Sequence, residues 1–170
     1  MKKYLPALVC GFAAGVLNVV PLVKTLSCCL IIPVAAYFAL VLNQKANRSE
    51  ADIKASQAAF LGLATGIFAA FFGTAFDMLI VFLTREISIA GSLPELENML
   101  QGVYPDSLAR EVMDIMYKVV DEINKYGFSM LYTLSVFMSS LVVNSIFGIV
   151  GGLIGMQVIN RRKNREDNNF

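Results

Sequence analysis

GTAFDMLIVFLTR, from Gly73 to Arg85, places an aspartate inside a long apolar run that starts near Ala58. The next charged residue after Asp77 is Arg85, at the very end of the run. An isolated charge among lipid tails costs at least ~2.5 kcal/mol, so a membrane helix turns such a group toward other protein groups. The role of Asp77 therefore depends on which segments cross the membrane and on which helices pack around it.

The composition favours a membrane protein over a soluble domain. The chain has 170 residues, of which 56% are hydrophobic and 16% are charged, whereas soluble domains carry about 25% charged residues. The apolar residues form long blocks, as expected for membrane helices. A net charge of +1 provides no field that would attract nucleic acid. With no histidine, His-Cys metal sites and histidine-based catalysis are excluded, and neither a metal nor another cofactor is expected.

Four apolar blocks are candidates for crossing the bilayer. They cover residues 4–20, 26–42, 58–84 and 128–159, and a crossing needs ~17–25 mostly apolar residues. The first block starts like a signal peptide but lacks a small-x-small cleavage site before a polar chain, so we interpret it as a retained helix. The predicted fold is all-α: one membrane domain over residues 1–170, built as an integral four-helix bundle.

The distribution of Lys and Arg predicts the orientation of these spans. Nine of the 14 basic residues lie in the N-terminus, the linker 43–57 and the tail after residue 159. The positive-inside rule places such segments in the cytoplasm. Both termini are therefore expected inside, and segment 85–127, with eight acidic and four basic residues, is expected outside.

Segment 85–127 is predicted to be an extracytoplasmic insertion of two amphipathic helices. Ser92 and Glu95 have capping-box spacing, which predicts a helix that Gly102 would end. The second helix is expected to open at Asp106 and to end at Gly127. Apolar residues recur along it at steps of three and four: Leu108, Val112, Ile115, Met116, Val119, Val120 and Ile123. This face could cap the bundle, or it could dock a second chain or the membrane interface.

Small residues form stripes along three of the four blocks. Lipid supplies no hydrophobic drive between helices, so membrane helices associate through close backbone approach and interhelical hydrogen bonds. Projected at ~100° per residue, the stripes predict the packing faces. The glycines expected to pack helices are Gly11, Gly15, Gly62, Gly66, Gly73, Gly148, Gly151, Gly152 and Gly155.

Polar residues within the spans are the candidate functional groups. They are Asp77, Asn18, Asn144, Thr133 and Ser140. Asp77 extends a packing stripe, with Tyr132 and Thr133 at comparable depth on the last block. One interpretation is a hydrogen-bonded or protonated clip between helices. The other is a cation or proton site, since intramembrane carboxylates commonly have functions.

Cys28 and Cys29 are adjacent near the outward end of the second block. Adjacent cysteines can form a strained disulfide or bind a soft metal. No third ligand lies near them in the sequence, so small buried side chains are the favoured interpretation.

The order of these features resembles small, uncharacterised bacterial four-span membrane proteins. The features are GFAAGVLNVVPL at 11–22, CCLIIPVAAYFAL at 28–40, a charged turn, and a Gly/Ala-rich stretch at 60–76. The likeness covers roughly residues 5–80. The resemblance implies a multi-pass protein of the bacterial inner membrane. It implies no activity and no functional residues.

Two classes of function are expected from the sequence. The first is a non-enzymatic packing or assembly protein, bound to a second copy or to a membrane-protein partner through 85–127. The alternative is a small transporter or channel component that uses Asp77 and neighbouring polar groups. An enzyme is not expected, because the spans supply a single carboxylate and catalysis needs convergent titratable groups.

Overall fold

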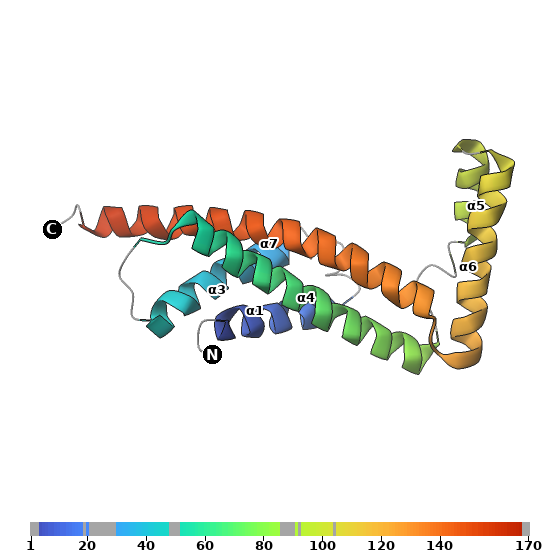
Figure 1. The fold of residues 1–170 in the computed structure, drawn as a ribbon, viewed down its shortest axis with the longest axis horizontal. Helices are drawn as coiled ribbons and strands as arrows, with labels where there is room; N and C mark the ends of the chain where they lie inside the picture. Colours follow the sequence, from blue (N-terminus) through green and yellow to red (C-terminus); the bar gives the residue numbers. More distant parts are fainter. Residues whose placement is uncertain are drawn as a thin grey trace. The chain divides into compact units, whose positions relative to one another are not determined.

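The computed structural model describes residues 4–18, 20, 30–47, 52–85, 91, 93–103 and 105–167. These residues form six helices and no strand (Figure 1). The helices are α1 (Leu5–Leu17), α3 (Ile32–Asn47), α4 (Ala55–Thr84), α5 (Leu93–Val103), α6 (Asp106–Tyr126) and α7 (Met130–Asp167). The all-α class is confirmed for this part of the chain. Cys28, Cys29 and Ser92 lie outside the described residues, and so does residue 26, where the second span was expected to start. The last helix starts at Met130, two residues after the start expected for the fourth span at residue 128.

Among the described residues, two helices are long and apolar enough to cross a membrane. They are α4, with 30 residues, and the stretch Met130–Arg165 of α7, with 36. Helices α1 and α3 have 13 and 16 residues, which is below the ~17–25 that a crossing takes. Length and composition thus give weak support to a membrane protein, and the four crossings stay a prediction.

The bounds of the described helices can be set beside the expected spans. Helix α4 ends at Thr84, where the third span was expected to end, and α7 continues eight residues beyond residue 159, the end expected for the fourth span. Its extension contains Arg and Lys, which are good helix formers when they can reach water. The first block forms helix only from Leu5 to Leu17, and α3 continues past residue 42 to Asn47.

The chain divides into two compact units. Unit 1 comprises Met1–Phe76 and Val136–Phe170, and unit 2 comprises Asp77–Ser135. Helices α4 and α7 each contribute one end to each unit. Asp77 is thus the first residue of unit 2 on α4.

Unit 1 joins α1, α3, the first part of α4 and the greater part of α7. Its buried residues are mostly small, as helices that approach closely require. One core cluster contains Ala7, Ala39, Leu40, Ala58 and Leu61, and a second contains Ala14, Ile32 and Ala69. Helix α3 contacts α1 as well.

Unit 2 is built around α6. Val119 and Ile123 of α6 form a buried cluster with Val81 of α4, and α5 packs against α6 (Figure 1). The helix ends at Gly127, whose φ of 74° is left-handed and suits a residue without Cβ. The predicted start and end of this helix are confirmed. The predicted end of α5 at Gly102 is wrong by one residue, since the helix includes Val103.

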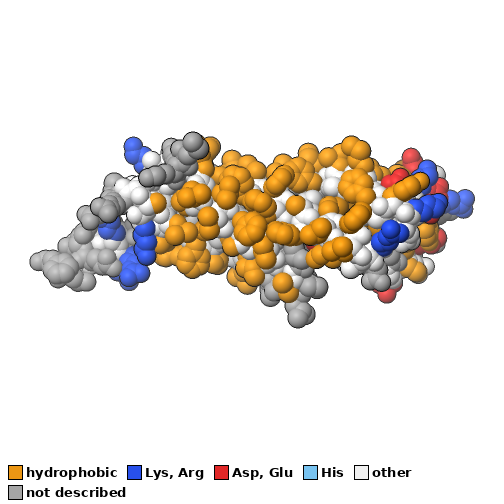
Figure 2. All heavy atoms as spheres, turned by 90° about the horizontal axis from the view of Figure 1, so that it is seen from below, with side chains coloured by type: hydrophobic (Ala, Val, Ile, Leu, Met, Phe, Trp, Pro, Cys, Tyr) orange, Lys and Arg blue, Asp and Glu red, His pale blue; other side chains and the backbone are white. Residues whose placement is uncertain are grey.

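Large hydrophobic side chains cover much of the outer surface. Figure 2 shows them spread over the helices on the face it draws. On α7 they recur every four residues, at Val142, Ile146, Val150, Ile154 and Val158, and all five are exposed. A contiguous exposed apolar surface of this extent marks contact with a membrane or with another protein.

Candidate functional site

The closest helix contact in unit 1 lies between α4 and α7. A Cβ placed on Gly62 would collide with the carbonyl of Gly148, and a Cβ on Gly148 would collide with the carbonyl of Gly62. One turn along, a Cβ on Gly66 would collide with the carbonyl of Asn144. Gly152 meets the carbonyl of Ala58 in the same way. The two backbones are thus in direct contact, and Cα–H···O interactions recur in such geometry.

A second glycine contact joins α1 to α4. A Cβ on Gly11 would lie 2.6 Å from the Cβ of Phe68, and a Cβ on Gly15 would lie 2.9 Å from the backbone nitrogen of Gly73. The side-chain nitrogen of Asn18 lies next to Gly73, 3.4 Å from where a Cβ would stand. Asn18 therefore lies at the end of this contact.

A third contact joins α3 to α7. A Cβ on Gly151 would collide with the Cα of Pro33, and a Cβ on Gly155 would lie 3.2 Å from the Cα of Tyr37. Pro33 stands in the first turn of the described part of α3, where its missing N–H costs little. Helix α7 thus offers two adjacent small-residue faces, one to α4 and one to α3.

The structure divides the stripe that the sequence predicts on α4. Gly62 and Gly66 contact α7, whereas Ala69 and Gly73 contact α1. At ~100° per residue these four residues fall within one arc of about 60°, so the same face contacts α7 along its first half and α1 along its second. A straight projection identifies the small-residue face and misses the change of partner along it.

Two buried polar atoms in unit 1 have no hydrogen-bond partner among the described residues. They are the side-chain nitrogen of Asn144 and the hydroxyl of Thr74. Asn144 is 2% exposed. Thr65, also buried, donates its hydroxyl to the carbonyl of Leu61 at 2.8 Å. Ser140 is half-buried one turn before Asn144 on α7.

Asp77 and Thr133 belong to unit 2. Asp77 is half-buried, and the phenol of Tyr132 lies near it. The hydroxyl of Thr133 lies 2.8 Å from the carbonyl of Ser129 and 3.0 Å from the sulfur of Met78. Asn18 thus lies at the contact of α1 with α4 and Asn144 at the contact of α4 with α7, whereas Asp77 and Thr133 lie in unit 2.

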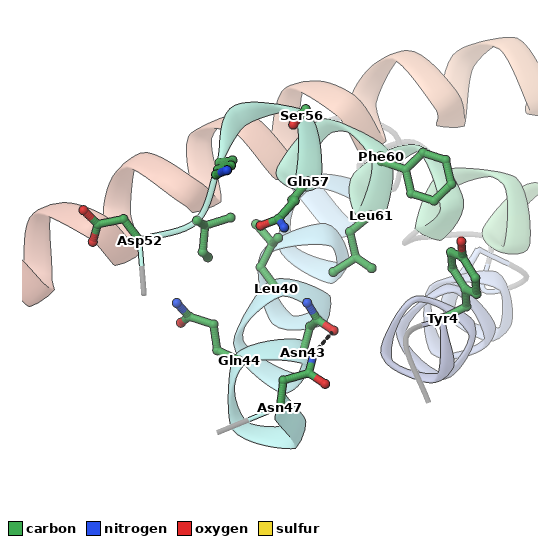
Figure 3. Close-up of a pocket in the computed structure, with 12 residues that line it drawn as sticks. Tyr4, Leu40, Asn43, Gln44, Asn47, Asp52, Ser56, Gln57, Phe60 and Leu61 are labelled. Atoms are coloured by element: carbon green, nitrogen blue, oxygen red, sulfur yellow. Dashed lines mark hydrogen bonds between the residues drawn. The ribbon is translucent and has the colours of Figure 1, made fainter. Parts of the chain in front are cut away.

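A pocket of about 600 Å³ opens where α1, α3 and the start of α4 meet (Figure 3). Carboxamides dominate its polar lining, with Asn43 and Gln44 on α3 and Gln57 on α4. Asn43 accepts a hydrogen bond of 2.9 Å from the amide of Asn47. Tyr4 and Phe60 stand at its α1 side, with ring centroids 5.9 Å apart. None of these residues is among the candidates expected from the sequence, because isolated amides near helix ends form no motif.

A side-chain clamp holds the segment that borders this pocket. The amide of Asn160 on α7 accepts from the N–H of Ile53 and donates to its carbonyl, both at 3.1 Å. The amide thus pairs with a backbone as a neighbouring strand would. Lys163 adds an ion pair with Asp52 at 3.6 Å. Asn160 and Ile53 are 107 residues apart, and no sequence pattern predicts their contact.

Within the described residues no group of three His, Cys, Asp or Glu side chains is placed to hold a metal ion. In comparisons with known proteins, no family model, no curated protein and no solved structure matches the chain. The class that the fold defines is an all-helical protein with two helices fit to cross a membrane. The resemblance to small bacterial four-span proteins stays a prediction.

Proposed function

We propose that this chain is a multi-pass protein of the bacterial inner membrane, with four spans and both termini in the cytoplasm. We further propose that it acts without catalysis, as a packing and assembly protein. The observation that carries this proposal is the backbone contact at Gly62, Gly66, Gly148 and Gly152. A closed interior of this kind suits a rigid scaffold, whereas transporters place their substrate site near the bilayer midplane in a polar cavity.

The surface offered to a partner is segment 85–127. Its helices α5 and α6 expose charges of both signs; Lys125 and Asp121 pair at 2.7 Å while both stay well exposed. Charged and solvated surfaces of this kind steer partners and set specificity more than they add affinity. The partner is a second copy of this chain or another membrane protein.

Co-purification in mild detergent tests this function. Two copies of the full chain with different tags are expressed together, and one tag is captured. We expect either the second copy or one defined membrane protein in stoichiometric amount. The exposed Arg110 of α6 changed to Glu should reduce capture, whereas Arg165→Glu on the α7 tail serves as the matched charge control. An unrelated four-span protein with the same tag gives the background of the capture. If the wild type captures neither partner above this background, the assembly function is rejected.

One observation favours the alternative, a small transporter or channel component with Asp77 at its pathway. Asn144 and Thr74 each bury a polar atom without a partner among the described residues. Buried polar groups are normally hydrogen-bonded, and such atoms can bind a passing solute. Cation flux into vesicles that contain the purified chain, measured for wild type and Asp77→Asn, tests it. Flux that requires Asp77 would replace the assembly function, and absence of flux rejects the alternative.

A further inference from the structure

Helix α6 has an apolar side that the rest of unit 2 covers only in part. In the C-terminal half, Val119 and Ile123 are buried against Val81 of α4, with Tyr132 of α7 packed beside them. In the N-terminal half, α5 packs against α6, and Ala109 is buried. The apolar side is therefore occupied near the ends of α4 and α7 and open further along.

The open part consists of Leu108, Val112 and Ile115, which are 49%, 38% and 42% exposed. At ~100° per residue these three side chains fall within an arc of about 60°, and Val119 falls inside the same arc. Because Val119 contacts Val81 near the end of α4, the arc lies on the same side of α6 as this contact. Helix α6 crosses those ends instead of running along them (Figure 1).

The ends of α4 and α7 within unit 2 are themselves apolar on the outside. The exposed large hydrophobic residues there are Leu79, Ile80, Phe82, Leu83, Met130, Leu131 and Leu134. In a protein that spans the membrane these side chains face lipid. The open arc of α6 and this apolar surface then lie on the same side of α6, with lipid as their shared neighbour.

We infer that α6 lies on the outer surface of the bilayer, with Leu108, Val112 and Ile115 inserted at the boundary of headgroups and acyl chains. Helices with one apolar and one charged side bind membranes in this position. Tyr126, exposed in the last turn of α6, falls on the same arc. The chain has no Trp, so tyrosine is the residue left to anchor the interface. The inference rests on the membrane placement in the proposed function.

Lipid fits this face better than a second copy does. Three partly exposed aliphatic side chains fall far short of the ~800 Å² that each partner buries in a stable complex. A lipid contact needs less affinity, because α4 and α7 already hold α6 at the membrane and raise its effective concentration there. The opposite side of α6 stays in water, free to meet the partner of the proposed function.

The headgroups that suit this face are zwitterionic. Glu111 and Glu122 border the open arc at ~100° per residue, and both are exposed. Anionic headgroups would repel these carboxylates, whereas a zwitterionic surface has no net charge to oppose them. Phosphatidylcholine vesicles are therefore the appropriate probe.

The absence of Trp allows a direct test with the full chain in such vesicles. Single variants Val112→Trp and Leu108→Trp report from the open arc, and Asp114→Trp reports from the opposite side of the same helix. Phe71→Trp, at an exposed position on α4, reports on membrane insertion itself. Each is measured for quenching of its fluorescence by phospholipids brominated along the acyl chain.

We expect strong quenching at positions 112 and 108, several-fold more than at 114, and strong quenching at 71. Quenching can instead be strong at position 71 but no stronger at positions 112 and 108 than at position 114. The arc then does not touch lipid, and only this inference is overturned. If 71 is not quenched, the membrane placement and this inference both fall. A third outcome is that neither brominated lipid nor a neutral water-soluble quencher reduces the fluorescence at positions 112 and 108 when the protein density in the vesicles is high. If quenching returns at low density, a second copy covers the arc, and the inference is overturned.

Discussion

The carbonyl of Asn144 on α7 occupies the place where a side chain at Gly66 on α4 would have to stand. Gly62 and Gly148 repeat this relationship one turn away, in both directions. A helix pair that touches backbone to backbone excludes lipid and solute from the contact. The loss of stability when a side chain replaces one of these glycines therefore measures how closely α4 and α7 pack.

A single methyl group at Gly66 should destabilise the bundle. Gly66→Ala forces α4 and α7 apart, and overpacking of this kind costs about 1–3 kcal/mol. Thermal unfolding in detergent measures the loss. Gly91→Ala is the matched control, because a Cβ on Gly91 meets nothing within 4 Å. Equal stability of the two variants would mean that α4 and α7 do not touch here.

Gly127→Ala should destabilise unit 2, and Gly127→Asn should destabilise it less. The left-handed conformation of Gly127, with φ of 74°, costs an L-residue about 1–2 kcal/mol, and asparagine tolerates it best. A Cβ would also stand 3.1 Å from the ring of Phe82. Circular dichroism during thermal unfolding ranks the variants. A ranking with alanine above asparagine would contradict the left-handed end of α6.

The clamp formed by Asn160 predicts a graded loss of stability. Asn160→Asp retains the acceptor for the N–H of Ile53 and loses the donor to its carbonyl. Asn160→Leu loses both hydrogen bonds, each worth about 0.5–1.5 kcal/mol. Limited proteolysis near Ile53, with Asn164→Leu as the exposed control, should show cleavage in the order Leu, Asp, wild type. Identical cleavage of the wild type and both Asn160 variants would show that these hydrogen bonds do not hold the segment at Ile53.

Labelling with a membrane-impermeant maleimide checks the predicted topology. In a chain whose native cysteines are replaced by serine, Asn124→Cys should react in intact cells. Asn47→Cys and Asn164→Cys should react only after the membrane is opened, because Lys and Arg concentrate on the cytoplasmic side. All three side chains are exposed, so accessibility reflects the side of the membrane. Reaction of Asn164→Cys in intact cells would reverse the topology.

Local features of the fold were predictable because they depend on neighbours in the sequence. Pro105 followed by Asp106, and the later Gly127, mark the bounds of α6 through backbone chemistry. The spacing of Gly62 and Gly66 marks a packing face. The partner of each glycine was not predictable, since Gly62 and Gly73 share a stripe and contact different helices. The clamp of Asn160 on Ile53 depends on tertiary structure alone and leaves no periodic signal.

The candidate site shows the same limit. The sequence located Asp77 and Asn144 as polar groups in apolar helices, but residue spacing could not show that they fall into different compact units. The pocket lined by Asn43 and Gln57 was missed, because it forms where three helices meet and no segment contains it. Composition predicts which groups are unusual, and packing decides which of them meet.

The last prediction concerns Asp77, where the clip and the cation site differ in outcome. For a clip, Asp77→Asn should change stability little, because the amide keeps an acceptor and adds donors for nearby groups such as Tyr132. Asp77→Leu should lower stability, since interhelical hydrogen bonds in membranes average ~0.6 kcal/mol and reach ~1.7 kcal/mol. Thermal unfolding of wild type, Asn and Leu variants, with and without added cations, measures both effects. We expect the clip. Stabilisation of the wild type by a cation, absent from Asp77→Asn, would reject the clip and favour the transporter, because only the carboxylate's charge distinguishes these two proteins.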